Sequence, residues 1–407
     1  MLEAENNPTP RAVREPTALT RWIISRRVLG PHMDGARIAR RRRKAEAMRQ
    51  RSGAPHVVDY YHQLDDPYSH LTAQVLATFA ARYDIQLNVH LIRAAGGTFQ
   101  PELEKLAIWA RRDAAWVAPH LGLTFPATAG MVPAVAHQEL VARALAGVSV
   151  SEFVAKLRDL SDALWTGDEA ALQSLTVGRV SATEAAAALA AGSEHLAAAG
   201  HYSGATFYYA GEWYWGVDRL FHLELRLRDL GVCRTLDEAL IAPRPEIDLA
   251  GVDASALRLD YYPSLNSPYT AINFDATIAL KNICGIEFHH KPVLPMVMRG
   301  VPAPRTKTQY LVFDTKREAD FAGVPFGNAL FPIGRPTREA YSLLPWAQAL
   351  GKDEALMSSL LRHAFALGVG LHRRSGMRRA VEAAGLDWAA AQRVLGSDDW
   401  KPIVEQS

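Results

Sequence analysis

The chain of 407 residues is poor in cysteine, with only Cys233 and Cys284. The two lie far apart in the sequence, so the chain contains neither a C-x-x-C redox pair nor a cysteine spacing typical of a zinc site. We therefore expect no dithiol redox chemistry.

Long apolar runs are also missing. No uninterrupted stretch reaches the roughly 18 to 20 residues that a membrane-spanning helix needs. Near the N-terminus, the apolar segment 22–24 is too short for the core of a secretory signal, and Arg26, Arg27 and Arg37 follow it. The hydrophobic fraction of 49% and the charged fraction of 22% are typical of an ordinary globular protein. We therefore expect a soluble, cytoplasmic protein without a membrane partner.

The net charge is only +2, yet positive charge is concentrated between residues 37 and 51. The basic residues there are Arg37, Arg40, Arg41, Arg42, Arg43, Lys44, Arg49 and Arg51. Such a segment could bind nucleic acid or an acidic surface, but few aromatic side chains that stack on bases lie among the charges. We therefore expect a solvated basic helix that packs on the domain following it, and no nucleic-acid partner.

The hydrophobic pattern predicts a basic N-terminal extension over residues 1–54 and a first domain over residues 55–241. The domain opens with strand, helix and strand patterns, and such a crossover implies parallel strands. The elements expected in order are a strand at 56–61, a helix at 67–82, a strand at 86–91, an alanine-rich helical stretch at 103–199, a hairpin at 205–209 and 212–215, and a helix at 217–230.

The opening of this domain recurs 201 residues later in the chain. Asp59-Tyr60-Tyr61 corresponds to Asp260-Tyr261-Tyr262, and Asp66-Pro67-Tyr68-Ser69 corresponds to Ser267-Pro268-Tyr269-Thr270. After a linker at 242–256, we predict a second domain at 257–407 with a strand at 257–262, a helix at 268–282 and a strand at 287–290. The chain ends at Ser407 without a counterpart of the hairpin and last helix, so the second domain is predicted to be incomplete.

In both copies a helix begins with proline at its first position. Ser267 is the predicted N-cap of the second copy's helix, and serine is a preferred N-cap residue whether or not the site is active. A helix N-terminus can stabilise an anion by up to about 2 kcal/mol, which lowers the pKa of a thiol by rather more than one unit. If the thiol belongs to a bound cofactor, the protein needs a hydroxyl donor here and no cysteine of its own.

Asn266-Ser267-Pro268-Tyr269, between a strand and a helix, resembles the opening signature of 2-hydroxychromene-2-carboxylate isomerases and kappa-class glutathione transferases, in the DsbA-like thioredoxin superfamily. The resemblance implies an α/β fold of two thioredoxin-like domains in tandem, each with an inserted α-helical subdomain, the second lacking its C-terminal hairpin and helix. It also implies glutathione as cofactor, with Ser267 as the catalytic residue that stabilises the thiolate. Asn266, Pro268 and Tyr269 would then bind the cofactor or substrate.

The first domain departs from the family pattern, because Asp66 replaces the serine and a carboxylate would repel a thiolate. Asp66 and Ser69 occupy both cysteine positions of DsbA, which excludes redox exchange here. Ala205 replaces the family's cis-proline, and we expect a trans bond because a cis bond before alanine costs about 3 kcal/mol. We therefore predict a degenerate site comprising Asp66, Tyr68, Ser69 and Ala205.

The first domain nevertheless contains Gly216-Val217-Asp218-Arg219, which resembles the family's Gly-x-Asp-Arg turn that binds the γ-glutamyl end of glutathione. The resemblance makes Asp218 and Arg219 cofactor-binding residues, although an acid in the first turn of a helix also has a structural explanation. On this interpretation neither domain carries a full site.

The leading functional hypothesis is a glutathione-dependent isomerase or transferase acting on a small-molecule substrate. One alternative is a DsbA-like oxidoreductase, which would need a redox cysteine such as Cys284, and another is a non-catalytic binding or scaffold protein of thioredoxin fold. Four histidines could suggest a metal site, but their spacing matches no metal-ligand motif, so we expect no metal site. These four are His62, His70, His289 and His290.

Overall fold

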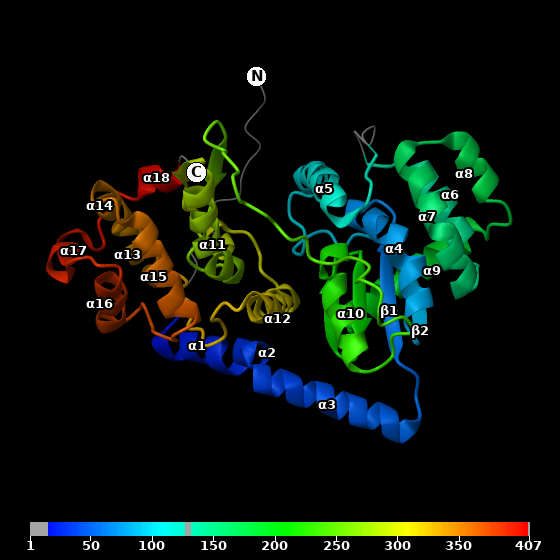
Figure 1. The fold of residues 1–407 in the computed structure, drawn as a ribbon, viewed down its shortest axis with the longest axis horizontal. Helices are drawn as coiled ribbons and strands as arrows, with labels where there is room; N and C mark the ends of the chain where they lie inside the picture. The colour runs from blue at the N-terminus through cyan, green and yellow to red at the C-terminus, as the bar shows by residue number, and fades with distance from the viewer. Residues whose placement is uncertain (1–14, 127–131, 406–407) are drawn as a thin grey trace. The chain divides into compact units, whose positions relative to one another are not determined.

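The computed structural model describes residues 15–126 and 132–405 of an α/β protein. The chain divides into two compact units (Figure 1). The four-stranded unit comprises residues 42–247, and the two-stranded unit comprises the chain up to Arg41 together with the chain from Asp248 onward. The boundary after Ile247 falls inside the predicted linker at 242–256.

The four-stranded unit contains a mixed sheet with the strand order β2-β1-β3-β4. β1 is parallel to β2, β1 is antiparallel to β3, and β3 and β4 form an antiparallel hairpin through Ala210 and Gly211. Both turn residues have positive φ, as the favoured two-residue hairpin turns require. The predicted β-α-β opening and hairpin are confirmed, with β1 at Val57–Gln63, α4 at Pro67–Arg82, β2 at Gln86–Ile92, β3 at Thr206–Tyr209 and β4 at Glu212–Trp215.

Side chains of β1 alternate between the two faces of the sheet. Val58 and Tyr60 are fully buried in the main core with Phe79 of α4. Tyr61, on the opposite face, packs with Leu196 of α9 (Ala182–Ala198). The face that carries Asp59 and Tyr61 is therefore covered by α9.

Helices fill the chain between β2 and β3 in the described residues. Serine caps start two of them, because Ser149 and Ser181 each form a reciprocal capping box with a glutamate three residues later. The elements are α5 (Leu103–Val117), η2 (Ala118–Leu121), α6 (Val135–Leu145), α7 (Val150–Thr166), α8 (Glu169–Leu175) and α9, and after the hairpin come η3 (Val217–Arg219) and α10 (Leu220–Asp229).

Helix α9 approaches β2 at Gly192, where a Cβ atom would lie 2.1 Å from the carbonyl oxygen of Leu91. Gly192→Ala is therefore expected to lower the free energy of unfolding by about 1 to 2 kcal/mol through overpacking, although alanine favours helix by about 0.5 to 1 kcal/mol. Urea denaturation measures this change. Ala191→Gly, at an exposed position of the same helix, measures how much the helix propensity of alanine over glycine contributes to stability there. A stabilised Gly192→Ala protein would show that α9 does not make this close approach.

The two-stranded unit contains the second β-α-β segment, with β5 (Arg258–Tyr261) parallel to β6 (Glu287–His290) and α11 (Pro268–Cys284) between them. Arg258 pairs with Glu287 as Val57 pairs with Gln86, so the register repeats at the same interval of 201 residues. Residues 291–405 add helices and no further strand: η4 (Met296–Arg299), α12 (Arg305–Ala322), α13 (Arg335–Ser342), α14 (Leu344–Ala349), α15 (Asp353–Phe365), α16 (Arg374–Ala383), α17 (Trp388–Val394) and α18 (Lys401–Glu405).

The N-terminal segment is divided between the units, which differs from the single extension predicted over residues 1–54. Its first helices are α1 (Ala18–Trp22), the π-helix η1 (Ile23–Leu29) and α2 (Gly30–Met33). Leu29 and Met33 are buried in the core of the two-stranded unit, and the buried guanidinium of Arg21 donates to the carbonyl oxygens of Phe331 and Ile333. These hydrogen bonds attach the segment to this unit, and the ion pair of Arg21 with Glu15 compensates the buried charge.

The basic helix α3 (Gly35–Ser52) lies within the predicted N-terminal extension. From Arg42 onward it belongs to the four-stranded unit, where Arg42 forms two hydrogen bonds of 2.7 Å with the carboxylate of Glu212. The expected packing of the basic helix on the domain that follows it is therefore confirmed.

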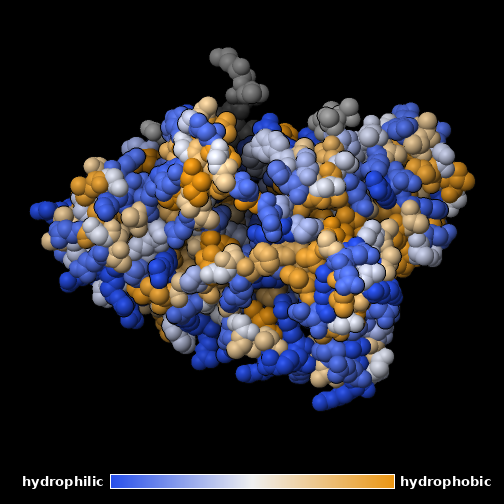
Figure 2. All heavy atoms as spheres, viewed as in Figure 1, coloured by the Kyte–Doolittle hydropathy of each residue, from blue (hydrophilic) through white to orange (hydrophobic). Residues whose placement is uncertain are grey.

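On the face shown in Figure 2, hydrophilic and hydrophobic residues are interspersed. Within the described ranges, none of the helices combines the length and the apolar character that a membrane crossing requires.

Candidate functional site

Ser267 caps the N-terminus of α11 as predicted. Its backbone is extended, with φ −89° and ψ 121°, and its Oγ accepts a hydrogen bond of 3.2 Å from the backbone N–H of Thr270. Pro268 fills the first helical position, where its missing N–H costs nothing. Because Ser267 uses a lone pair of Oγ in the cap, its hydroxyl proton can be donated to a ligand.

Two neighbours of Ser267 complete this helix end. The Oδ1 atom of Asn266 is buried and has no hydrogen-bond partner among the described residues. The hydroxyl of Tyr269 donates to Oδ2 of the buried Asp314 at 2.7 Å, and Arg317 forms an ion pair with the same carboxylate. The ring of Tyr269 is thus held in place.

Asp66 occupies the equivalent position at the N-terminus of α4. Its carboxylate accepts hydrogen bonds from the backbone N–H groups of Tyr68 and Ser69 and from the hydroxyl of Ser69, at 3.4, 2.9 and 2.7 Å. Burial raises the pKa of Asp66 to about 6, although these hydrogen bonds favour the charged form. At neutral pH this helix N-terminus therefore already holds an anion.

The surroundings of the two caps match at the interval of 201 residues. Tyr68 donates to Asp113 at 2.6 Å, as Tyr269 donates to Asp314. The side-chain oxygen of Ser69 accepts from the backbone N–H six residues earlier, and so does that of Thr270. The two sites are thus built alike and differ in the charge of the capping residue. Asp113 was not singled out from the sequence, although its separation of 201 residues from Asp314 was a usable signal.

The loop before β3 lies against the degenerate site. Ala205 has a trans peptide bond, as expected, since the described residues contain no cis bond, and its φ is 54°. A Cβ on Gly204 would lie 2.8 Å from Oγ of Ser69 and 3.1 Å from Oδ2 of Asp66. The backbone N–H of Gly216 donates to the carbonyl oxygen of Ala205 at 2.9 Å. This bond attaches the predicted γ-glutamyl turn to the same loop.

Asp218 and Arg219 form an ion pair of 2.5 Å in that turn. Burial is the main reason that the pKa of Tyr68 lies above its ordinary value, and the negative charges of Asp113, Asp66 and Asp218 raise it further. The structure therefore gathers the predicted residues of the first domain at one end of α4, while Ser267 and its neighbours belong to the other unit.

No protein family model and no curated protein matches the chain.

The cysteines lie away from both caps. Cys284 is the last residue of the 17-residue helix α11, is 3% exposed, and stands about 25 Å along the helix from Ser267 at 1.5 Å per residue. Cys233 belongs to the four-stranded unit, where its backbone forms an isolated antiparallel β-bridge with that of Tyr83. Neither position supports the alternative of a redox cysteine at a helix N-terminus.

The four histidines considered from the sequence each contact a neighbouring side chain. His62 and His70 are buried near Tyr60 and Ser161, and burial lowers their pKa values to about 3 and about 4. His289 and His290 interact with Glu287 and Asp353.

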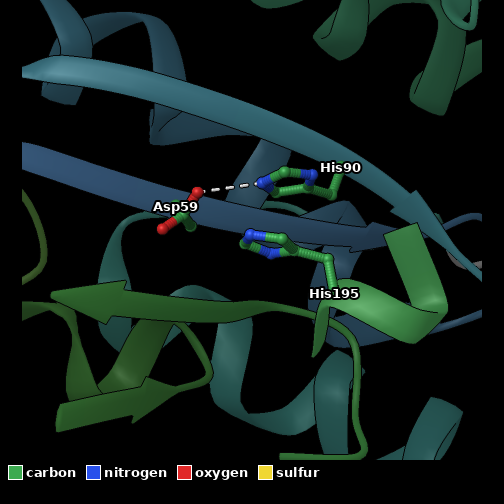
Figure 3. Close-up of side chains that lie close together, drawn as sticks. All are labelled: Asp59, His90 and His195. Atoms are coloured by element: carbon green, nitrogen blue, oxygen red, sulfur yellow. Dashed lines mark hydrogen bonds and ion pairs between the residues drawn. The ribbon is translucent and has the colours of Figure 1, made fainter. Parts of the chain in front are cut away.

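A different cluster, formed by Asp59, His90 and His195, was missed in the sequence (Figure 3). Its members come from β1, β2 and α9, and no short motif connects them.

Proposed function

We propose that the chain is a glutathione-dependent enzyme of the isomerase or transferase type. In this proposal the N-terminus of α11 holds the glutathione sulfur as a thiolate, and the hydroxyl of Ser267 donates a hydrogen bond to it. The observation that carries the proposal is the contrast between two matched caps. Asp66 places a carboxylate at the N-terminus of α4, whereas Ser267 leaves the N-terminus of α11 without an anion of its own.

The helix end supplies enough energy for this task. Stabilisation of an anion by up to about 2 kcal/mol corresponds to a fall of about 1.5 units in the pKa of the thiol. A thiol with an ordinary pKa of about 8.5 is only a few per cent ionised at pH 7, and after this fall about half of it is thiolate. The thiolate would add to an electrophilic or unsaturated carbon of an aromatic acid. In an isomerisation, elimination of the same thiolate would follow, without net oxidation.

Two further observations support a peptide-like cofactor and the family resemblance. The unpaired Oδ1 of Asn266 suits an amide N–H, of which the tripeptide glutathione has two. The repeated strand register and the repeated Tyr–Asp hydrogen bond support a tandem pair of thioredoxin-like domains. In such a pair the four-stranded unit retains the fold but does not catalyse the reaction, because the carboxylate of Asp66 would repel a thiolate.

Calorimetric titration of glutathione into the full chain tests the proposal. Ser267→Ala is expected to weaken binding at least about tenfold, because a hydrogen bond to a charged group contributes roughly 1.5 to 3 kcal/mol. Ser267→Asp, which copies the cap of α4, is expected to weaken binding at least as much because its carboxylate repels the thiolate.

Asp66→Ser makes the reverse change at the matched position and is expected to leave this binding unchanged. S-methylglutathione cannot form a thiolate, so its affinities for the native chain and for Ser267→Ala should differ only slightly. No saturable binding at millimolar glutathione, or equal affinity in all the variants, would refute the proposal.

A further inference from the structure

We propose that Asp59, His90 and His195 form a binding site for a divalent transition-metal ion of the zinc class. One potential ligand atom from each side chain lies within 4.8 Å of the other two. Figure 3 shows the carboxylate of Asp59 and both imidazole rings directed toward a common region. One carboxylate and two imidazoles with a free coordination position are a ligand set that zinc uses in catalytic sites.

The fold brings these residues together by register and close packing. Asp59 pairs with Asn88 across the parallel strands β1 and β2, and His90 lies two residues further along β2 on the same face. Gly192 allows α9 to approach the backbone of β2, and His195 follows three residues later. The rings of His90 and His195 are stacked with their centroids 4.4 Å apart.

Neighbouring side chains orient the three ligands. Nδ1 of His195 lies 2.8 Å from the hydroxyl of Tyr61, so Nε2 is the nitrogen left for a metal. Asn88 donates to Oδ1 of Asp59 at 3.1 Å, and Nε2 of His90 lies 2.9 Å from the same oxygen. A metal would replace the proton shared between Asp59 and His90. Tetrahedral zinc ligands stand roughly 3.3 to 3.6 Å apart, so the Asp59–His90 pair would open slightly. The planes of the His90 and His195 rings lie 17° apart, so the two rings would tilt for both nitrogen lone pairs to meet one ion.

The electrostatic surroundings accept a cation. Asp59 also lines a cavity of about 570 Å³ between α3 and the sheet, together with Arg42, Arg49 and Arg226. Arg42 and Arg226 form ion pairs with Glu212, and Arg49 forms one with Glu46. Arg42 and Arg226 share the single carboxylate of Glu212, and the further acid Asp229 lines the same cavity. His195 is an exposed residue, which gives an ion access from solvent.

Zinc titration of the chelator-treated full chain, followed by calorimetry, tests this site. We expect one equivalent of Zn²⁺ to bind, and His90→Ala and His195→Ala each to weaken binding at least about a hundredfold. Tyr61→Phe keeps the ring but loses the hydroxyl, and is expected to weaken binding about 10- to 100-fold. His137→Ala, which removes a histidine of α6 outside the cluster, is the matched control and should bind as the native chain does.

Cobalt substitution gives a second readout that does not depend on the variants folding. The visible absorption of Co²⁺ bound to the native chain should have the intensity of a four- or five-coordinate site, and an equimolar amount of Zn²⁺ should displace it. Absence of zinc binding at micromolar concentrations would overturn the proposal and leave Asp59–His90 as a hydrogen-bonded pair. Native affinity in both folded histidine variants would overturn it equally.

Discussion

Glu212→Gln is expected to lower the free energy of unfolding of the four-stranded unit by about 3 to 5 kcal/mol, the largest loss that we expect from a single substitution. Glu212 lies on β4 with its side chain 5% exposed, and its Oε2 atom is 2.7 Å from Arg42 and 3.3 Å from Arg226. Glutamine keeps the shape but removes the charge. The arginine charges then lose their compensation, which costs more than the original ion pairs contributed.

Urea denaturation monitored by tryptophan fluorescence measures this loss. The control is Glu238→Gln, because Glu238 pairs with Arg82 at 2.5 Å while its side chain is 55% exposed. Exposed pairs contribute about 0 to 1 kcal/mol, so this variant should remain close to the native chain. Equal losses in the two variants would show that the Glu212 network is no more buried than an ordinary surface ion pair.

Asp66→Asn is expected to raise the free energy of unfolding, compared with the native chain, by about 2 to 3 kcal/mol more at neutral pH than at pH 4. Burial raises the pKa of Asp66 from 3.8 to about 6 in the folded state. Between these two values the unfolded chain loses the proton while the folded chain keeps it, so the native protein loses stability as the pH rises. Above about pH 6 both states are ionised and the loss is complete. The asparagine variant carries no titrating group at this position and avoids the loss.

Denaturant unfolding of both proteins across pH 4 to 8 measures the difference. Asp168→Asn, at the exposed N-cap of α8, sets the baseline for replacing a capping carboxylate with an amide. A difference between Asp66→Asn and the native chain that stays constant over this range would mean that Asp66 titrates alike in the folded and unfolded states. The carboxylate would then be better solvated than the structure indicates.

Local sequence patterns predicted most of the elements of the fold. The predicted bounds of α4 and β6 agree with the structure, because proline positions, caps and hydrophobic periodicity act over a few residues. The packing of the N-terminal helices could not be predicted in this way. The contact between Arg21 and Phe331 joins residues 310 positions apart, and no local pattern identifies such a partner.

The same distinction applies to the candidate sites. Ser267 was predicted as an N-cap from its position before Pro268, and this cap is observed, as is that of Asp66 at the corresponding position before Pro67. The cluster of Asp59, His90 and His195 depends on strand register and on a close helix approach, which a single sequence does not specify. Its residues are separated by long stretches of chain and follow no ligand motif.

The most direct test of the proposed thiolate site is the pKa of glutathione bound to the full chain. Carbon-13 NMR of glutathione labelled at its cysteine β-carbon, recorded across pH with saturating protein, reports thiol ionisation without interference from Cys233 and Cys284. We expect the bound thiol to titrate at least about one unit below its free value of about 8.5, and Ser267→Ala to raise that pKa again. A bound thiol that titrates at its free value in the native chain would contradict the account, because the N-terminus of α11 would then stabilise no thiolate.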